Sequence, residues 1–184
     1  MVVIQTPRLS LRTWEPGDLA EIVRVTNTEA VMLHLGGVAS PQDCRTLFER
    51  IQASQRENGF CFWLVERRED RARLGLCGFK RGTVDPVLGA LEIGWRFRQD
   101  AWGQGYAREA ASACLDWAWR NVADNRIVAI TIEANRASWG LMERLGMRRN
   151  PALDFEHPNF APDHPCCPHI TYEAARPLWR RNAQ

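Results

Sequence analysis

The order of apolar and polar residues at the N-terminal end of the chain predicts one strand followed by two helices. Within Val2–Trp14, the alternation Leu9-Ser10-Leu11-Arg12 predicts the strand. After a turn at Glu15–Asp18, apolar residues at helical spacing predict the first helix. Ser40-Pro41-Gln42-Asp43 supplies an N-cap, a first-turn proline and an acid, and predicts a second helix that ends near Asn58-Gly59.

Strand patterns then follow one another through residues 60–97. Phe60–Glu66, Leu74–Phe79 and Leu91–Phe97 are rich in apolar and aromatic residues, and polar turns separate them. Short polar connections between successive strands are typical of antiparallel hairpins. The middle of the chain is therefore predicted to form an antiparallel sheet.

The C-terminal half changes to a mainly helical period. Residues 105–120 predict an amphipathic helix whose core stripe consists mostly of small side chains (Ala107, Ala110, Ala111, Cys114, Leu115, Ala118). The β-branched run Arg126–Ala134 predicts a buried strand, and a short helix is expected between the N-cap Asn135 and Gly146. After a proline-rich loop, His169–Ala175 predicts the last strand. The whole chain is thus predicted to form a single α/β (α+β) domain, with a mixed, mostly antiparallel central sheet and flanking helices.

The overall composition fits such a domain and argues against two other classes of protein. The 184 residues carry 24 basic and 22 acidic side chains, and a net charge of +2 is too balanced for bulk binding of nucleic acid. No segment approaches the roughly 20 apolar residues of a membrane span, and the N-terminal residues lack the features of a signal peptide. A cytoplasmic protein without membrane or nucleic-acid partners is expected.

Cysteine and histidine usage gives no support for a disulfide framework or a metal site. The six cysteines form no C-x-x-C pair and stand mostly among apolar residues, so reduced, buried thiols are expected. His164-Pro165-Cys166-Cys167-Pro168-His169 contains four potential metal ligands, but adjacent cysteines between prolines do not converge easily on one zinc ion. No metal is therefore predicted.

The densest chemical signal is the segment Trp102-Gly103-Gln104-Gly105-Tyr106-Ala107, between the strand ending at Phe97 and the helix 105–120. The first turn of a helix has unpaired N–H groups and partial positive charge, and glycine lets the main chain approach an anion closely. A tight turn without a ligand is the alternative interpretation. The segment has neither the lysine of a P-loop nor a third small residue at the Rossmann spacing, where Arg108 stands.

The order of short motifs along the chain resembles that of the GCN5-related N-acetyltransferase (GNAT) superfamily, especially the branch that includes the ribosomal-protein N-terminal acetyltransferases. The motifs that carry the resemblance are Thr6–Arg12, Trp63–Val65, Gly75–Phe79, Glu92–Trp95, Trp102–Ala110, Asn135–Ser138 and Glu143–Met147. The resemblance implies a sheet that is splayed where Leu91–Phe97 and Arg126–Ala134 part, and transfer of an acetyl group from acetyl-CoA to an amine. Since no residue pair suggests a covalent nucleophile with its base, direct attack in a ternary complex is expected.

The resemblance also implies specific contacts with the coenzyme. The family motif Q/R-x-x-G-x-G/A corresponds to Trp102 through Ala107, with Trp102 in place of the usual glutamine or arginine. Because main-chain amides hold the phosphates, this departure is expected to matter little. The main chain near Phe97 and Arg98 is implied to pair with the pantetheine arm and to stabilise the oxyanion. The side chain of Asn135 is implied to lie near the same arm, and a plain helix cap is its alternative role.

Two residues are candidates for moving protons. Many family members have a tyrosine as proton donor where this chain has Met142, and the resemblance implies that Ser138 is the nearest substitute. A serine hydrogen-bonded to the helix backbone is the alternative. Glu92 alternates with Leu91 and Ile93, so it faces away from their core side and is the preferred base, with a solvated or salt-bridged carboxylate as the alternative. Weaker candidates for the base are Glu66, His34 and His157.

No motif identifies the acceptor. The resemblance slightly favours a protein N-terminal α-amine, and a small amine such as an antibiotic, a polyamine or an amino acid is the alternative. Deprotonating a lysine of pKa ~10.4 at neutral pH costs about 4–5 kcal/mol, whereas an α-amine of pKa ~8 costs about 1–1.5 kcal/mol. An α-amine therefore needs less help from a base.

Two rival functions and one mode of assembly also fit the sequence. Met142 suggests a non-catalytic acyl-CoA-binding domain, and an aminoacyl-tRNA-acetylating toxin would need a strongly basic surface. Tryptophans gather in the second half of the chain (Trp95, Trp102, Trp117, Trp119, Trp139). They are expected to form core, a self-association face of a homodimer, or part of the acceptor pocket.

Overall fold

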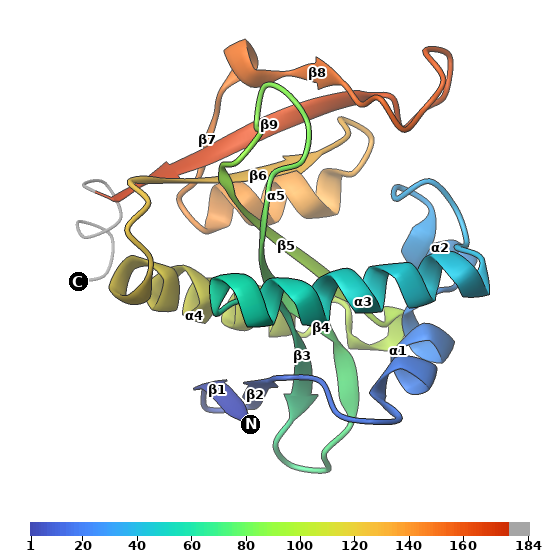
Figure 1. The fold of residues 1–184 in the computed structure, drawn as a ribbon, viewed down its shortest axis with the longest axis vertical. Coiled ribbons are helices and arrows are strands. Elements are labelled where there is room, and N and C mark those ends of the chain that lie inside the picture. Colours follow the sequence, from blue (N-terminus) through green and yellow to red (C-terminus); the bar gives the residue numbers. More distant parts are fainter. Residues whose placement is uncertain (177–184) are drawn as a thin grey trace.

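A computed structural model describes residues 1–176, which form a nine-stranded sheet with helices packed against it (Figure 1). The strands, in chain order, are β1 (Val2–Gln5), β2 (Leu9–Arg12), β3 (Phe62–Arg67), β4 (Arg73–Arg81), β5 (Leu91–Phe97), β6 (Arg126–Thr131), β7 (Arg148–Arg149), β8 (Phe155–Glu156) and β9 (Pro168–Ala175). The helices are α1 (Asp18–Thr26), α2 (Glu29–Met32), α3 (Pro41–Asn58), α4 (Tyr106–Asn121) and α5 (Arg136–Arg144).

The sheet is mixed and mostly antiparallel, as predicted. Its strand order is β1-β2-β3-β4-β5-β6-β9-β7, and β8 pairs with β9 outside this path. The pair β5–β6 is parallel, and the other pairs formed by residues 1–176 are antiparallel. Helix α4 connects β5 to β6, as a parallel pair requires a crossover connection.

Helix α3 begins and ends as its sequence predicts. The Ser40 hydroxyl accepts a hydrogen bond from Asp43 N at 3.1 Å, and the Asp43 carboxylate accepts one from Ser40 N at 3.3 Å. This reciprocal pair is a capping box, with Pro41 in the first turn. At the other end Gly59 adopts φ 76°, which stops the helix.

The N-terminal segment Val2–Trp14 forms two strands where the alternation predicted one. Strands β1 and β2 pair as an antiparallel hairpin around a turn at Thr6, whose N–H donates to Leu9 O at 2.9 Å. All four residues of β2 are buried, including Arg12. The short elements α2, β7 and β8 were also missed, because two to four residues are too few to show a period.

The two faces of the sheet have different coverings. On one face, Leu91, Ile93, Cys77 and Cys114 belong to the main core beneath α4. Cys77 Sγ and Cys114 Sγ lie 3.7 Å apart across this contact, because small residues on α4 let the helix lie close to the sheet. On the other face, Ile22 of α1 packs against β3 and β4 in a second cluster. Below, the second face is called the α1 face.

Four charged residues on the α1 face, at the β2 side of the sheet, form what we call the closed network, because each has a partner of opposite charge (Arg12, Asp18, Glu66, Arg73). Glu21 and Arg71 add outer ion pairs with Arg73 and Glu66. Arg12 donates to both oxygens of Asp18, at 2.7 and 3.0 Å, and to Glu66 at 3.3 Å. Arg73 donates to Asp18 at 2.7 Å. Burial alone would raise the pKa of Asp18, but the hydrogen bonds from Arg12 and Arg73 hold it below its ordinary value. The carboxylates of Asp18 and Glu66 therefore take the place of the water that Arg12 loses on burial.

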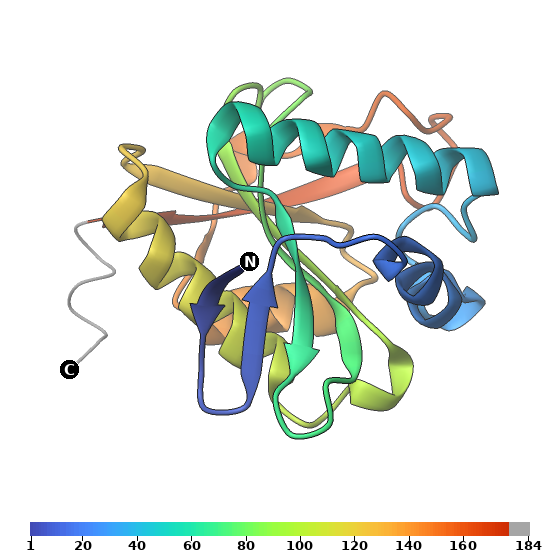
Figure 2. The ribbon, with the colours of Figure 1, turned by 60° about the horizontal axis from the view of Figure 1, so that its bottom comes forward.

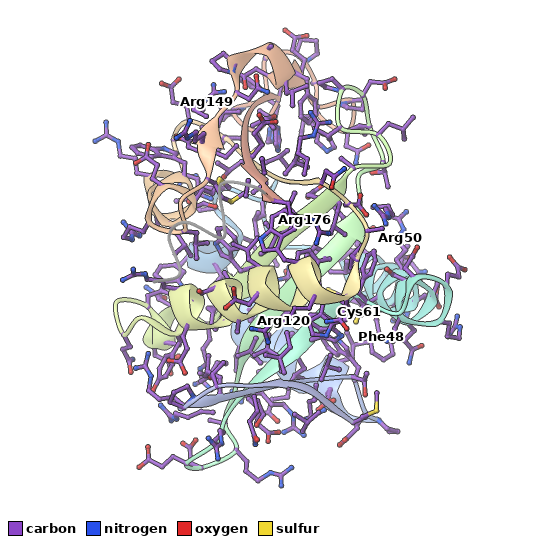
Figure 3. The ribbon with its side chains drawn as sticks, turned by 90° about the vertical axis from the view of Figure 1, so that its left-hand side faces the viewer. Phe48, Arg50, Cys61, Arg120, Arg149 and Arg176 are labelled. Carbon is purple, nitrogen blue, oxygen red and sulfur yellow. The ribbon has the colours of Figure 1, made fainter. Side chains whose placement is uncertain are left out.

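The remaining features of the described chain concern its thiols and the length of its helices. Five of the six cysteines are buried, as predicted, and Cys44 is partly exposed. In the side view, Phe48 of α3 and Cys61 lie near each other, and Arg149 of β7 lies toward the opposite end of the molecule (Figure 3). No helix within residues 1–176 has the length and apolar character that crossing a bilayer requires.

Candidate active site

Strands β5 and β6 separate shortly after they meet. They pair only at Leu91 with Ile127 and at Glu92 with Val128. Beyond this point β5 continues to Phe97 along β4, while β6 continues to Thr131 along β9. Figure 2 shows β6 and β9 running across the direction of β3 and β4. The predicted splay is confirmed, and it leaves one edge of β5 without a neighbouring strand.

The free edge of β5 carries main-chain groups that no strand uses. Arg98 N donates to Leu74 O at 2.8 Å, so Arg98 and, by alternation, Arg96 turn their main-chain groups toward β4. The main-chain N–H and C=O groups of Trp95 and Phe97 consequently point away from β4, toward the free edge of β5. The carbonyl of Arg98 is also engaged, since it accepts from Ala101 N at 3.1 Å. The N–H of Phe97 thus lies at the open edge, whereas the Phe97 carbonyl accepts from Trp102 Nε1 at 3.0 Å and both main-chain groups of Arg98 are engaged within the chain.

The segment Trp102–Ala107 presents a row of main-chain donors at the start of α4. Gly103 and Gly105 adopt φ 73° and 80°, a backbone conformation that residues with a side chain rarely adopt. The N–H groups of residues 103–108 donate to no acceptor within residues 1–176. No side chain caps the N-terminus of α4, so no capping side chain occupies the N–H groups at this partially positive end of the helix. This arrangement fits a diphosphate held by backbone amides.

A bracket from the N-terminal turn holds this loop in place, and sequence reasoning missed it. We use the name N-terminal bracket for Thr6, Arg8 and Glu109. The Glu109 carboxylate accepts from Thr6 Oγ1 at 2.6 Å, Arg8 N at 3.0 Å and Arg8 Nε at 2.7 Å. Arg8 also donates to Gln104 O at 2.9 Å and lies 4.5 Å from the ring centre of Tyr106. The signal in the sequence was an acid in the first turn of a predicted anion-binding helix, which needs a neutralising partner.

Helix α5 carries one hydroxyl, that of Ser138, the candidate proton donor. Asn135 caps the helix, since its side chain accepts from Ser138 N at 3.3 Å. The hydroxyl of Ser138 is partly buried and forms no hydrogen bond within residues 1–176. Met142, at the position of the usual tyrosine, is only 1% exposed and belongs to the main core. The alternative role of Asn135 as a helix cap is therefore observed, and Ser138 keeps a free hydroxyl.

Glu92 is a buried carboxylate at the point where β5 and β6 part. It lies opposite Lys80 in the β4–β5 register, and Lys80 Nζ is 3.2 Å from Glu92 Oε2. The two groups form an ion pair but are not aligned for a hydrogen bond, so this oxygen has no hydrogen-bond donor within the described chain. Burial raises the pKa of Glu92, and the charge of Lys80 opposes that rise. Its predicted orientation, away from the core side of Leu91 and Ile93, is confirmed.

The weaker candidates for the base lie in other surroundings. The carboxylate of Glu66 is paired with Arg12 in the closed network, at the β2 side of the sheet and away from the free edge of β5. His157 stacks near His169, with ring centres 4.8 Å apart, and burial lowers the pKa of both rings. His34 follows α2 and is partly buried.

The segment His164–His169 packs as an ordinary loop. Cys166 and Cys167 are each 3% exposed, and His164 Nδ1 accepts a hydrogen bond from Cys166 N at 3.0 Å. Within residues 1–176, no group of three potential ligand side chains is arranged to hold a metal ion.

Both the sequence and the fold match those of known acetyltransferases. The family model described as an acetyltransferase (GNAT) domain matches residues 8–148. YkkB of Bacillus subtilis (strain 168) is 30% identical over 149 residues, which cover 80% of this chain and 86% of that protein. N-acetyltransferase YnaD of the same strain is 29% identical over 147 residues, which cover 79% and 82%. The chain belongs to the GNAT family.

Solved GNAT structures share the fold described above. RimL, a ribosomal L7/L12 alpha-N-protein acetyltransferase in complex with coenzyme A, aligns over 95% of this chain and 98% of that chain. The TM-score is 0.76 and the identity 14%, so the likeness to RimL is one of fold alone. As a GNAT enzyme the protein is an N-acetyltransferase of class EC 2.3.1.- that uses acetyl-CoA. The resemblance inferred from the sequence is therefore confirmed.

Proposed function

We propose that this GNAT enzyme acetylates an α-amine by direct attack in a ternary complex, with Glu92 as base and Ser138 as proton donor. The observation that carries the proposal is the free edge of β5 leading to the unpaired amides at the start of α4. A strand edge and a helix start, placed in succession, match an extended arm that ends in a diphosphate.

The proposed coenzyme contacts come from the main chain, and two side chains hold the contacting segments in position. Amides of the segment Trp102-Gly103-Gln104-Gly105-Tyr106-Ala107 bind the diphosphate, and the N–H of Phe97 binds the arm or the acetyl oxygen. The carbonyl of Phe97 already accepts from Trp102 Nε1 at 3.0 Å. Through this hydrogen bond Trp102 fixes the loop against the end of β5. Asn135 positions Ser138 by capping α5.

The proposed chemistry follows from the acetyl group that acetyl-CoA supplies as a thioester. The acceptor must arrive as a neutral amine, and a carboxylate of raised pKa is a stronger base than an ordinary glutamate. Glu92 fits this role because burial raises its pKa. In this proposal the free Ser138 hydroxyl gives a proton to the departing sulfur, a role that the buried Met142 cannot perform. Because an α-amine costs little free energy to deprotonate, a carboxylate base and a serine hydroxyl are sufficient for this acceptor.

The test of this proposal is release of free coenzyme A from acetyl-CoA in the presence of a panel of amines. Gly105→Glu places a side chain and a negative charge at the proposed diphosphate site, and acetyl-CoA affinity should fall at least hundredfold. The matched control is Gly59→Glu at the end of α3, since Gly59 has a similar φ of 76°. A Cβ at Gly59 meets nothing within 4 Å, and a Cβ at Gly105 meets only Arg8 Nη2, in ordinary contact at 3.4 Å. Equal coenzyme affinity in both variants would contradict the proposed site.

A second function, a non-catalytic acyl-CoA-binding domain, is favoured by one observation only, the buried Met142. The same experiment separates the two functions. Tight coenzyme binding without thiol release on any amine would favour the binding domain. Thiol release that depends on an amine would favour the enzyme.

A further inference from the structure

Arg96 stands out among the arginines of the α1 face because it has no carboxylate partner within residues 1–176. Its Nη1 donates only to Met32 Sδ, at 3.2 Å, and its Nε is buried without any hydrogen-bond partner. Burial lowers the pKa of this guanidinium. A buried cation without an anion is costly, so a structure that keeps one is expected to bring an anion to it.

The free atoms of Arg96 form one edge of the guanidinium. With Nη1 directed at Met32, the Nε and Nη2 atoms remain without partners in the described chain. Two parallel N–H groups on one edge match the two oxygens of a carboxylate. The geometry of the free edge thus corresponds to a planar anion with two oxygens.

The surroundings of Arg96 favour a single negative charge next to apolar groups. A small cavity between α1, α3 and the sheet is lined by Arg96 and by apolar side chains (Trp14, Ile22, Leu47, Phe48, Leu76). Three further polar residues line the cavity. Asn27 donates to and accepts from the main chain of Ala39, the acid Asp43 serves in the capping box of α3, and Cys44 is a partly exposed thiol. Arg96 is the only basic residue of the lining among residues 1–176. One guanidinium suits a carboxylate better than a doubly charged phosphate.

Arg96 is also on the correct part of β5 to meet an acceptor. Glu92, Gly94 and Arg96 alternate along the strand, so all three belong to the α1 face. A side chain at Gly94 would approach the ring of Phe62 to 3.0 Å, which shows that this ring covers the strand between the other two residues. Four residues of extended strand separate Glu92 from Arg96 by about 13 Å between Cα atoms. The side chains at both positions are long enough to contact one small molecule, although Glu92 is not among the residues that line the cavity beside Arg96.

We propose that Arg96 binds the carboxylate of the acceptor, so that the substrate is a small amine that also carries a carboxylate, as an amino acid does. This inference rests on the proposed function, because it names the substrate of the same site. The amine would lie toward Glu92 and the carboxylate on the free edge of Arg96. An amino acid satisfies both ends, whereas a protein N-terminus carries its carboxylate far away.

The first experiment measures binding without turnover. Calorimetric titration of the protein with N-acetyl amino acids and with their amides, in the presence of coenzyme A, compares ligands that differ only in the carboxylate. The acid forms are expected to bind at least tenfold more tightly than the amides. Arg96→Met should remove this preference, and Arg24→Met should keep it, because Arg24 is a 69% exposed arginine on α1.

The second experiment measures turnover with amino acids and their amides as acceptors. The ratio of kcat/KM between acid and amide should exceed tenfold in the wild-type protein and fall to about one in Arg96→Met. Arg96→Lys, which keeps the charge without the two-pronged edge, should retain part of the preference and shows whether loss in Arg96→Met reflects misfolding.

The possible results separate this inference from the proposed function. Equal binding of acids and amides, or tighter binding of phosphomonoesters than of carboxylates, would overturn the role of Arg96. Acetylation of peptides with no dependence on Arg96 would do the same. Selective binding of the acids without coenzyme A release on any amine would instead overturn the proposed catalysis and leave the carboxylate site standing.

Discussion

Arg12 and Arg96 lie on the same face of one sheet, on β2 and β5, yet their surroundings are opposite. Arg12 donates to Asp18 and Glu66 and is 5% exposed. Arg96 is mostly buried and has no carboxylate partner within residues 1–176. Removing a charge whose partners lie inside the chain leaves those partners buried and unpaired, whereas a charge without such partners is available to bind another molecule, as proposed for Arg96.

The sharpest test of this comparison is the same substitution at both positions. Arg12→Met leaves Asp18 buried without its main partner, so the free energy of unfolding should fall by about 3–5 kcal/mol. Arg96→Met removes an unpaired cation, so the protein should become as stable as the wild type or more stable, by about 1 kcal/mol. Urea denaturation of both variants measures the difference. A loss of similar size at both positions would show that Arg96 is as structural as Arg12.

The next largest effect is expected in catalysis at Glu92. Glu92→Gln should lower kcat by about 10²–10⁴-fold, the usual contribution of a general base. Because burial raises the pKa of Glu92, the wild-type rate should rise with pH on the acid side of the profile, and the variant should lose that limb. The control is Glu66→Gln, a carboxylate of the closed network. If both variants keep the acid limb, Glu92 is not the base.

Stability should depend on pH in opposite directions at the two regions. The raised pKa of Glu92 means that the native state binds this proton more tightly, so its contribution to stability is present at low pH and is lost as the pH rises through the folded pKa. The lowered pKa of Asp18 gives a contribution that is present above its ordinary value and lost as the pH falls. Comparing Glu92→Gln with the wild type over pH 4–8 isolates the first contribution.

A smaller effect is expected at Ser138. Ser138→Ala removes the free hydroxyl without disturbing the cap, because Asn135 bonds to the Ser138 N–H. We expect kcat to fall about tenfold, at the low end for a positioned proton donor, with little change in acetyl-CoA affinity. Steady-state kinetics with acetyl-CoA as the varied substrate measures both quantities. A wild-type kcat would eliminate Ser138 as the donor.

The smallest effect is expected at the N-terminal bracket. Arg8→Ala leaves Glu109 in the first turn of α4 without its neutralising partner, 2.7 Å away in the native protein. The KM for acetyl-CoA should rise about three- to tenfold, while kcat changes little. Glu109→Gln in the Arg8→Ala background should recover part of the loss, since it removes the unpaired charge. A double variant no better than Arg8→Ala would show that Arg8 acts by another route.

The sequence predicted those parts of the site that depend on local conformation. Three features follow from the conformational preferences of neighbouring residues, and the structure has all three. They are the helix cap at Ser40, the positive φ of Gly103 and Gly105, and the strand Leu91–Phe97. The splay followed from the family resemblance, and so did the proposal that the loop Trp102-Gly103-Gln104-Gly105-Tyr106-Ala107 binds coenzyme A.

The sequence did not predict which charges meet. Arg12 looked like the polar half of an alternating strand, but its partners Asp18 and Glu66 come from other elements of the fold. The same holds for Arg8 with Glu109, about a hundred positions apart. Arg96 was passed over because an arginine without a partner is recognisable only once the positions of all the carboxylates are known.

The N-terminal bracket has a consequence for how the protein responds to its substrate. Thr6 and Arg8 donate to Glu109 and Gln104, so the turn between the first two strands and the start of α4 with its preceding loop form one connected unit. A ligand that orders the loop must then also slow local opening of the N-terminal hairpin, by linkage. Amide hydrogens of the first twelve residues should exchange more slowly when coenzyme A is bound, although no coenzyme atom needs to touch them.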